Sequence, residues 1–382
     1  MKMLPEFYQT HLQSQLTCAH FLILKLLINL LQSQKQVRLE RLARAFPYPI
    51  TLDSRRRKLQ RFLDLPGLTI QKILFPIITY WLTTYCTPTQ VLYITIDRTQ
   101  WGCINLLMVS LVWDKRALPL YWQLLPKLGS SNLSEQKAVI REVLPLFKGY
   151  KVVVLGDREF CSVDLGSWLR DEDVYFCLRL KRDEFIQIEG KIWLCLDALG
   201  LAPGVSLYFR GVKVTKTKKL PGFNVACKWI RKYYGWAPEE GWFILTNLES
   251  LKAAITAYKK RFCIEEMFRD CKSGGYNLEG TGVSGERLIT RILLMALAYS
   301  TAVIQGGEIK QMGVQKYVAR VKESGRSQRR RSTFGVGLDG QMWVNSMEEY
   351  AEPMAELMKL SRNKRPYYQQ GLRAARLIMS AA

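Results

Sequence analysis

One segment of the sequence places an acid, two cations and a phenol at spacings that suit one face of a helix. The spacings are three, four and seven residues, and the positions are Tyr258, Arg261, Glu265 and Lys272. At about 100° per residue, they fall within roughly 60° of one another on a helical wheel. Such a stripe suits an anionic substrate, because the acid can hold a metal ion while the other groups grip phosphate oxygens. A salt-bridge stripe on a solvated helix has the same spacing, so this segment alone leaves both interpretations open.

Two aspartates elsewhere follow runs of apolar and β-branched residues. The run 91–96 precedes Asp97, and the run 151–156 precedes Asp157. Both runs are typical of buried strands, and a strand end holds a carboxylate rigidly at the rim of a sheet, where ligands bind. Aspartate is also a frequent turn former. Three nearby acids compete for any such role: Glu159, Asp164 and Asp171.

Together, these aspartates and the later segment resemble the bacterial insertion-sequence transposases of the family that belongs to insertion sequence four. That family carries a Y-(2)-R-(3)-E-(6)-K signature, and every spacing is matched from Tyr258 to Lys272. Its first acid follows a strand, as Asp97 does. Its second acid lies in a stretch similar to residues 156–160, which read Gly-Asp-Arg-Glu-Phe. The resemblance covers most of the chain from about residue 91 to residue 304.

The resemblance implies an α/β fold, in which a ribonuclease H-like catalytic core is interrupted by a β-rich insertion and flanked by helical N- and C-terminal regions. It also implies that Asp97, Asp157 and Glu265 form a catalytic, metal-binding triad. Three carboxylates without histidine favour Mg²⁺ or Mn²⁺. Two such ions can activate water or a DNA 3′-hydroxyl and stabilise the leaving 3′-oxygen. Glu266 is turned about 100° away from Glu265 and is expected to serve structure.

The resemblance further implies contacts with DNA. It assigns phosphate contacts to three residues of the signature: Tyr258, Arg261 and Lys272. In members that pass through a hairpin end, a tryptophan in the insertion stacks on a flipped base, and Trp242 is the candidate here, since stacking recovers about 1–3 kcal/mol per base. Trp229 and Trp236 are its rivals. A core tryptophan in a β-rich region is the alternative.

The charge balance favours a polyanionic partner. The chain carries 56 Lys and Arg against 33 Asp and Glu, a net charge of +23 spread along its 382 residues. Such a charge favours a polyanion, and the resemblance implies that this partner is double-stranded DNA, namely the transposon ends and the target. No lipid anchor is evident, and the most apolar stretches (21–31, 73–82 and 292–304) are too short to span a bilayer. We therefore expect core segments and no membrane partner.

The cysteines and histidines indicate which metal sites and which thiol state to expect. Nine cysteines occur singly without a CxxC pair, and the two histidines are His11 and His20. A structural zinc site is therefore not expected. The unpaired cysteines and the absence of a signal-peptide pattern at the amino terminus predict reduced thiols and a cytoplasmic protein, and the resemblance implies association with the bacterial nucleoid.

The amino-terminal part, to about residue 85, is predicted to be helical. Two helices (21–31 and 37–46) precede Pro47 and Pro49, and a third helix then begins near Asp53 or Ser54, either of which can cap it. Its outer face is basic, with Arg55, Arg56, Arg57 and Arg61. This arrangement is typical of a helix-turn-helix module that would bind terminal inverted repeats. A solvated helix on an ordinary bundle is the alternative.

The remaining pattern divides the chain into regions. Strands are predicted at 91–97, 103–113, 117–125, 151–157 and 175–180, with a helix at 134–144. Short alternating runs fill 186–230, and helices follow at 251–272, 286–304 and 346–382. The predicted regions are a helical DNA-binding domain (1–88), the first part of the catalytic core (89–180), a β-rich insertion (181–250), the second part of the core (251–310) and a basic helical region for DNA binding or dimerisation (311–382).

Three functions share this basic, acid-bearing sequence. The first is an active transposase that cleaves at the ends of an insertion sequence and joins them to target DNA, in a homodimeric synaptic complex that the resemblance implies. The second is a catalytically silent DNA-binding regulator derived from a transposase. The third is a nuclease that cuts without joining. The intact signature favours the first.

Overall fold

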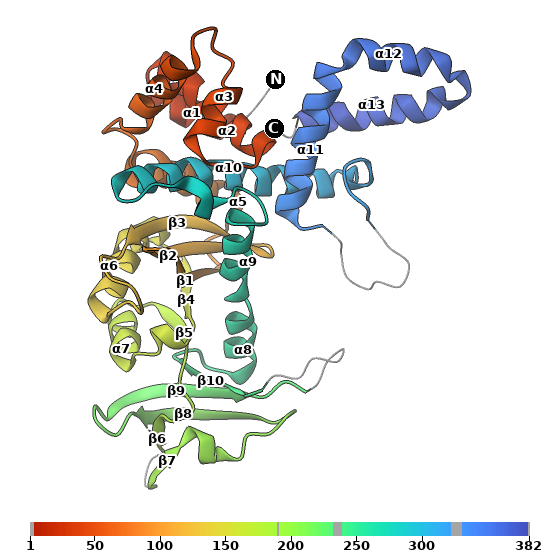
Figure 1. Cartoon of the computed structure of the whole chain (residues 1–382). Helices are drawn as coiled ribbons and strands as arrows, with labels where there is room; N and C mark the ends of the chain where they lie inside the picture. Colours follow the sequence, from red (N-terminus) through yellow and green to blue (C-terminus); the bar gives the residue numbers. More distant parts are fainter. Residues whose placement is uncertain (1–3, 189–190, 232–238, 322–330, 381–382) are drawn as a thin grey trace. The chain divides into compact units, whose positions relative to one another are not determined.

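The structure is a computed structural model that describes residues 4–188, 191–231, 239–321 and 331–380. It divides the chain into two compact units (Figure 1). One unit is Leu82–Met267, and the other combines Met1–Trp81 with Phe268–Ala382. The amino-terminal and carboxy-terminal segments, which the sequence analysis treated as separate regions, therefore share one unit.

Ten strands form one sheet in the unit Leu82–Met267. They are β1 (Val91–Trp101), β2 (Ile104–Trp113), β3 (Arg116–Leu124), β4 (Lys151–Gly156), β5 (Tyr175–Arg179), β6 (Phe185–Gln187), β7 (Trp193–Cys195), β8 (Ser206–Val214), β9 (Leu220–Lys228) and β10 (Trp242–Thr246). Their order across the sheet is β3-β2-β1-β4-β5-β10-β9-β8-β6-β7. The sheet and the helices that cover it confirm the predicted mixed α/β class.

Strand direction changes along this sheet. β1 is antiparallel to β2, and β2 is antiparallel to β3. β1 is parallel to β4, and β4 is parallel to β5. β2 is buried on both faces along nearly its whole length, which is why its sequence is almost continuously apolar rather than alternating. The parallel strands β1 and β4 bring their carboxyl ends to the same edge.

The β-rich segment after β5 extends the core sheet. β10 pairs antiparallel with β5, with Ile244 opposite Arg179, and β9 and β8 follow in order. Two short runs that the sequence suggested as separate strands, 205–209 and 212–216, form the single strand β8 with irregular pairing near Val212. This β-rich segment is thus continuous with the rest of the sheet through hydrogen bonds.

Helices cover both faces of the sheet. Figure 1 shows α6 (Leu133–Val143) and α7 (Val163–Asp171) on one side, and α8 (Leu251–Lys259) with α9 (Phe262–Cys271) on the other. Asn132 and Glu135 form a reciprocal capping box at the start of α6. α8 packs over β4, β5, β9 and β10 in a buried cluster that includes Val153, Cys177 and Tyr258. The sheet therefore fixes the position of α8.

The second unit is helical in its described residues. Its α-helices are α1 (Glu6–Gln15), α2 (Cys18–Gln34), α3 (Leu39–Ala45), α4 (Leu52–Leu63), α5 (Phe75–Tyr85), α10 (Glu286–Gln311), α11 (Thr333–Glu349), α12 (Ala351–Leu360) and α13 (Arg365–Ser380), with the ends of α5 and α9 crossing the boundary between the units. The cap of α4 is Thr51, whose hydroxyl accepts a hydrogen bond from the Ser54 N–H, rather than Asp53 or Ser54 as predicted.

Helix α10 is longer than the predicted 286–304. It has 26 residues, and by length and composition it could cross a membrane. However, 83% of its most apolar window is buried inside the structure, where it packs against α2 and α11. A buried core helix explains the same composition.

Two glycines let α10 and α11 approach closely. A Cβ atom added to Gly306 would lie 1.8 Å from the Thr333 carbonyl oxygen, and one added to Gly337 would lie 1.8 Å from the Ala302 carbonyl oxygen. No side chain fits at either position without separating the helices. The contact between the two helices therefore depends on glycine at both positions.

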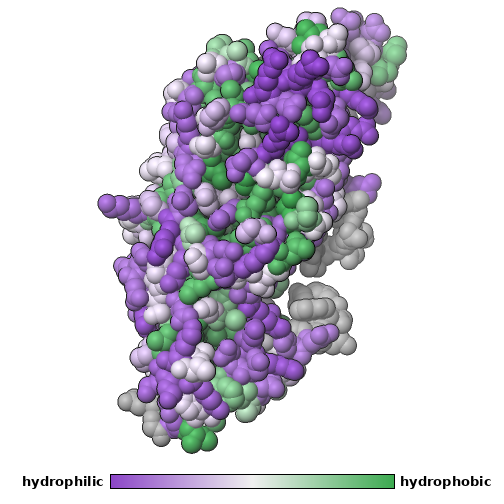
Figure 2. Space-filling view, turned by 60° about the vertical axis from the view of Figure 1, so that its left-hand side comes forward, coloured by the Kyte–Doolittle hydropathy of each residue, from purple (hydrophilic) through white to green (hydrophobic). Residues whose placement is uncertain are grey.

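The surface matches the polar, charged composition. On the face drawn in Figure 2, hydrophilic residues predominate and apolar residues lie between them in smaller groups.

All nine cysteines lie in described residues and are free.

Candidate active site

The register of β1 and β4 makes Asp97 and Asp157 neighbours. The parallel ladder between these strands ends with Ile96 opposite Gly156. Asp97 and Asp157 are the next residue on each chain, and adjacent strands lie about 4.8 Å apart. Asp97 does not end its strand as predicted: β1 continues to Trp101, paired with β2. Both carboxylates therefore lie where the parallel pairing stops.

A tight turn after β4 fixes Asp157. It caps the short 3₁₀ turn 158–160, and its carboxylate accepts a hydrogen bond of 2.9 Å from the Glu159 N–H. A Cβ atom on Gly156 would lie 2.7 Å from the Cβ of Phe160. Glycine at this position therefore allows the turn to fold back against the end of β4.

Glu159 is engaged in a network that holds the two strand ends together. Its two carboxylate oxygens share a bifurcated hydrogen bond from Arg98 Nε–H, with Nε at 2.9 and 3.1 Å from them. It also accepts hydrogen bonds from the backbone N–H and the hydroxyl of Ser131, at 2.8 and 2.7 Å. Arg98 in turn donates to the Asn105 side chain at 3.0 Å. This network assigns Glu159 to the positioning of Asp97 and Asp157.

The other acids that competed for a catalytic role lie in ion pairs or at the surface. Asp164 pairs with Lys218, and Asp171 is exposed at the end of α7. Glu266 forms an ion pair of 3.4 Å with the buried Arg116, which is consistent with the structural role expected for it.

The predicted single helix 251–272 is interrupted. α8 ends at Lys259 and α9 begins at Phe262, and the N–H groups of Lys260 and Arg261 bond to carbonyls three residues back. The helical wheel assumed an unbroken helix, so this part of the prediction was wrong. The break places Glu265 in the first turn of α9, where the helix dipole favours a carboxylate.

Arg261 lies in this break and binds Glu265. Its guanidinium is 2.5 Å from the Glu265 carboxylate, and the side chains are 6% and 49% exposed. Burial lowers the pKa of Arg261, but the neighbouring Tyr258, Glu265 and Asp97 more than offset this, so the net shift of the pKa is upward. A permanently charged, buried guanidinium thus fixes the orientation of Glu265.

The pKa of Asp97 reports the proximity of the other acids. Burial first, and then the Asp157 carboxylate, raise this pKa from 3.8 to about 7, and Glu265 adds to the rise. The Arg98 N–H, which donates to the Asp97 carboxylate at 2.7 Å, and the Arg261 guanidinium oppose it. The three acids of the predicted triad therefore share one electrostatic environment.

This shift predicts a pH dependence for the metal-free protein. Folded Asp97 holds its proton up to about pH 7, whereas the unfolded residue releases it near pH 3.8, so its contribution to stability falls as the pH rises through this window. Asp97→Asn removes the free-energy cost of ionising this buried carboxyl group. We expect the free energy of unfolding of the variant to exceed that of the wild type by an amount that grows with pH and levels off above pH 7. Urea unfolding in a chelator checks this, and a difference independent of pH would contradict it.

The acids fit a divalent cation by charge and by donor type. Among the described residues, no three His, Cys, Asp or Glu side chains are grouped closely enough to hold an ion as they stand. Burial and the neighbouring Asp157 carboxylate raise the pKa of Asp97, and a cation beside these acids would favour the ionised form of Asp97. Carboxylate oxygens are the ligands preferred by Mg²⁺ and Mn²⁺.

Tyr258 and Trp242 are packed against each other. Their ring centroids are 5.2 Å apart in an edge arrangement, and Phe262 lies 6.2 Å from Trp242. Tyr258 is 0% exposed, and its hydroxyl has no hydrogen-bond partner among the described residues. Burial raises its pKa, and the Arg261 and Arg179 guanidiniums oppose this. Tyr258 is thus enclosed in the hydrophobic cluster between α8 and the sheet.

The tryptophan candidates differ in their surroundings. Trp242 is partly buried at the start of β10, where it packs on the α8 cluster, which favours the core interpretation. Trp229 is also partly buried and follows β9. Trp236 lies outside the described residues.

The structure adds a charged group that the sequence analysis missed. Arg179 ends β5, its guanidinium is 2.5 Å from Glu240, and Arg158 pairs with the same carboxylate. Burial lowers the pKa of Arg179, while Tyr258 opposes this. A lone arginine in an otherwise apolar strand run was the available signal. It went unused because the antiparallel pairing of β5 with β10 was not foreseen.

The remaining predicted DNA contacts belong to the other unit. Lys272 forms an ion pair of 2.7 Å with Glu279. Arg55 donates hydrogen bonds of 3.1 Å to the carbonyls of Arg44 and Phe46 at the end of α3, and so has a structural role. Arg56, Arg57 and Arg61 are exposed on α4. Within the predicted basic region 311–382, residues 322–330 and 381–382 lie outside the described residues.

A family of known proteins matches the middle part of this chain. The model of the Transposase DDE domain family matches residues 104–301. This segment contains Asp157, Glu265 and all of the 258–272 signature, and it begins after Asp97. Among solved structures, a cryo-EM structure of a piggyBac transposase synaptic complex with hairpin DNA is similar, with 13% identity and a TM-score of 0.46, covering 92% of this chain and 79% of that chain. No match was found among curated proteins.

Proposed function

Because the chain belongs to the Transposase DDE domain family, we propose that it is a DNA transposase of the insertion sequence four type. It binds the terminal inverted repeats of an insertion sequence, cleaves at the ends and joins them to target DNA. The proposal rests above all on the register of β1 and β4, which makes Asp97 and Asp157 neighbours beside Glu265.

We propose that the catalytic core is ribonuclease H-like and that β6 to β10 form its insertion. The order β3-β2-β1-β4-β5, with β1, β4 and β5 parallel, supports this assignment. The division of the chain at 1–88, 89–180, 181–250, 251–310 and 311–382 remains a prediction about the roles of these segments.

The catalytic roles follow from the positions of the acids. Asp97, Asp157 and Glu265 would hold Mg²⁺ or Mn²⁺, with two ions expected. When bound, such ions would supply the chemistry that activates an attacking hydroxyl and stabilises the leaving oxygen of a phosphodiester. Arg261 keeps Glu265 oriented through its ion pair. The Arg98–Glu159 pair links β1 to the turn that follows β4 and so helps to hold Asp97 and Asp157 near each other.

Contacts with DNA are proposed for the remaining predicted residues. Lys272 and the exposed arginines of α4 carry charges suited to phosphates. Arg261 and the buried Tyr258 support the acids in the structure described, and direct contact with the transposon end would require them to become exposed. Base stacking by Trp242 would similarly require it to leave Tyr258.

The N-terminal role is tested by the double variant Arg57→Gln, Arg61→Gln. Both side chains are exposed on α4, so the fold is retained. Loss of two phosphate contacts should weaken end binding about tenfold or more and reduce the salt dependence of binding. Filter binding at several salt concentrations measures both, with Arg376→Gln on the exposed surface of α13 as the control. Unchanged affinity would remove α4 from the DNA interface.

The proposed complex is a homodimer on transposon ends and target DNA, in the cytoplasm at the bacterial nucleoid. The decisive experiment incubates the purified chain with the element's own end DNA and Mg²⁺ or Mn²⁺ and maps nicks and joined products. Cleavage at the boundary with joining supports the transposase. Cleavage without joining would support the nuclease, and tight end binding without metal-dependent cleavage would support the silent regulator.

A further inference from the structure

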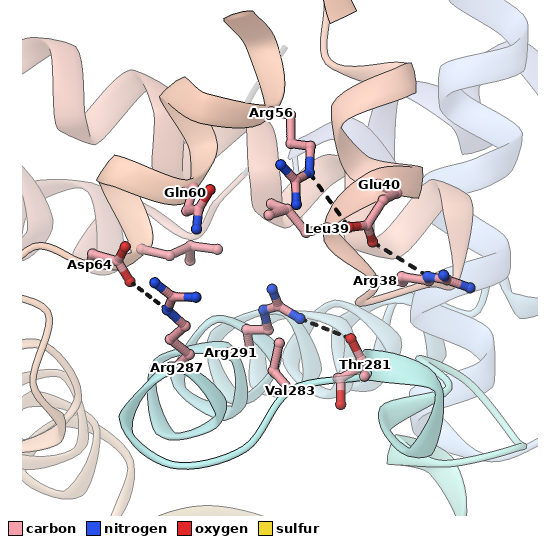
Figure 3. Close-up of a pocket in the computed structure, with 12 residues that line it drawn as sticks. Arg38, Leu39, Glu40, Arg56, Gln60, Asp64, Thr281, Val283, Arg287 and Arg291 are labelled. Atoms are coloured by element: carbon pink, nitrogen blue, oxygen red, sulfur yellow. Dashed lines mark hydrogen bonds and ion pairs between the residues drawn. The ribbon is translucent and has the colours of Figure 1, made fainter. Parts of the chain in front are cut away.

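A polar cavity lies between α3, α4 and α10, inside the helical unit and apart from the acidic site. Its volume is about 210 Å³. Figure 3 shows α3 and α4 on one side and α10 on the other, with the guanidiniums of Arg56, Arg287 and Arg291 directed toward the space between them. The charged residues that line it are Arg38, Glu40, Arg56, Asp64, Arg287 and Arg291.

The cations of this cavity outnumber the anions, since it has four arginines and two carboxylates. Glu40 is shared between Arg38, at 3.4 Å, and Arg56, at 3.6 Å. Asp64 lies 3.6 Å from Arg287. These distances are longer than those of close charge-assisted hydrogen bonds, so the acids compensate the guanidiniums incompletely.

Arg291 has the least compensation. It is 6% exposed, and its guanidinium donates a hydrogen bond of 3.0 Å to the Thr281 carbonyl oxygen. Among the described residues, no carboxylate forms an ion pair with it. A buried cation without a paired anion is costly, so the cavity gains from an anion that enters it.

Neutral donors complete the lining. The Thr281 side chain is 4% exposed, and its hydroxyl has no hydrogen-bond partner among the described residues. Gln60 contributes an amide from α4. Guanidinium forks with hydroxyl and amide donors match a tetrahedral oxyanion, which accepts several hydrogen bonds at once.

We propose that this cavity binds a phosphate group and, resting on the proposed function, that its ligand is a phosphodiester of the DNA held by this chain. Arg56 and Arg287 are 46% and 59% exposed, so a phosphate on a long polymer can reach them. Arg56 also shares α4 with the exposed Arg57 and Arg61, which continue the basic surface along the helix. The cavity would thus fix the position of one backbone phosphate.

The first arm of the test uses inorganic phosphate with the full chain. Thermal unfolding is compared in phosphate and in chloride at equal ionic strength. Phosphate should stabilise the wild type and the control Arg376→Gln. The double variant Arg56→Gln, Arg287→Gln should bind phosphate about tenfold more weakly or worse, since it loses two charge-assisted contacts. Asp64→Asn, which frees Arg287, should increase the response.

The second arm measures DNA binding against salt for the same variants. End DNA and an unrelated duplex of equal length are compared. The double variant should lose affinity for both duplexes by the same factor, and the slope of log affinity against log salt should fall by about one.

The outcomes distinguish a free phosphate from a DNA phosphodiester as the ligand. They also distinguish a failure of the cavity assignment from a failure of the proposed function. Loss in both arms supports a DNA phosphodiester. Loss of the phosphate response with unchanged DNA binding overturns the DNA source and identifies a site for a free phosphate. An unchanged phosphate response in the double variant overturns the cavity assignment. If the wild type does not prefer end DNA, the proposed function fails, while the phosphate arm still decides about the cavity.

Discussion

Replacing Glu265 with Gln is expected to lower the rate of metal-dependent cleavage at the transposon end by about a thousandfold or more. Loss of one ligand charge removes several kcal/mol of stabilisation from the reacting phosphodiester, and each 1.36 kcal/mol is about a factor of ten in rate. Gln keeps the size of the side chain and an acceptor for Arg261, so end binding should stay near that of the wild type. Single-turnover cleavage and filter binding measure the two quantities.

The adjacent acid provides a matched control. Glu266 pairs with Arg116 instead of Arg261. Glu266→Gln should therefore cleave at close to the wild-type rate, with at most a modest loss of stability. If Glu265→Gln cleaves normally, or if Glu266→Gln is the inactive variant, the assignment of the triad is wrong.

Gly306→Ala is expected to destabilise the helical unit by about 3 kcal/mol, at the upper end of the cost of overpacking. The added Cβ would lie 1.8 Å from the Thr333 carbonyl oxygen, and both atoms belong to rigid helical segments. The two helices must therefore move apart and lose packing along their contact. Urea denaturation followed by circular dichroism measures the change in the free energy of unfolding.

The neighbouring glycine separates this clash from helix propensity. A Cβ on Gly307 meets its nearest atom, Thr333 Cγ2, at 4.0 Å, which is ordinary contact. Alanine favours the helical state over glycine by about 0.8–1 kcal/mol, so Gly307→Ala should be neutral or stabilising. Equal effects of the two substitutions would show that α10 and α11 do not meet as described.

Local sequence pattern was sufficient for the strands that carry the aspartates. The apolar run 151–156 matched β4, and the run 91–96 matched the first part of β1, which continues to Trp101, because a largely buried strand leaves an apolar signature that needs no knowledge of its neighbours. The candidate triad could likewise be assigned from the sequence, because the residue types and the spacing of the signature are visible in the order of the residues alone.

Other features depended on contacts between distant residues. The wheel that grouped Tyr258 with Lys272 failed at the break after Lys259, because packing of α8 on the sheet overrides a helical pattern that continues in the sequence. The pairing of β10 with β5 and the engagement of Glu159 by Arg98 join segments more than sixty residues apart. No local periodicity reports such pairings.

In the arginine cavity, too, the sequence indicates the residue types and the tertiary structure decides how they are arranged. Each of its arginines appears in the sequence as one more basic residue on a polar helix face, and the composition predicts an anionic partner. Their convergence joins residue 38 to residue 291 across α3, α4 and α10. Net charge and periodicity are properties of the chain as a string of residues. The distances between the arginines and the carboxylates decide which charges remain uncompensated, and the packing of the helices fixes these distances.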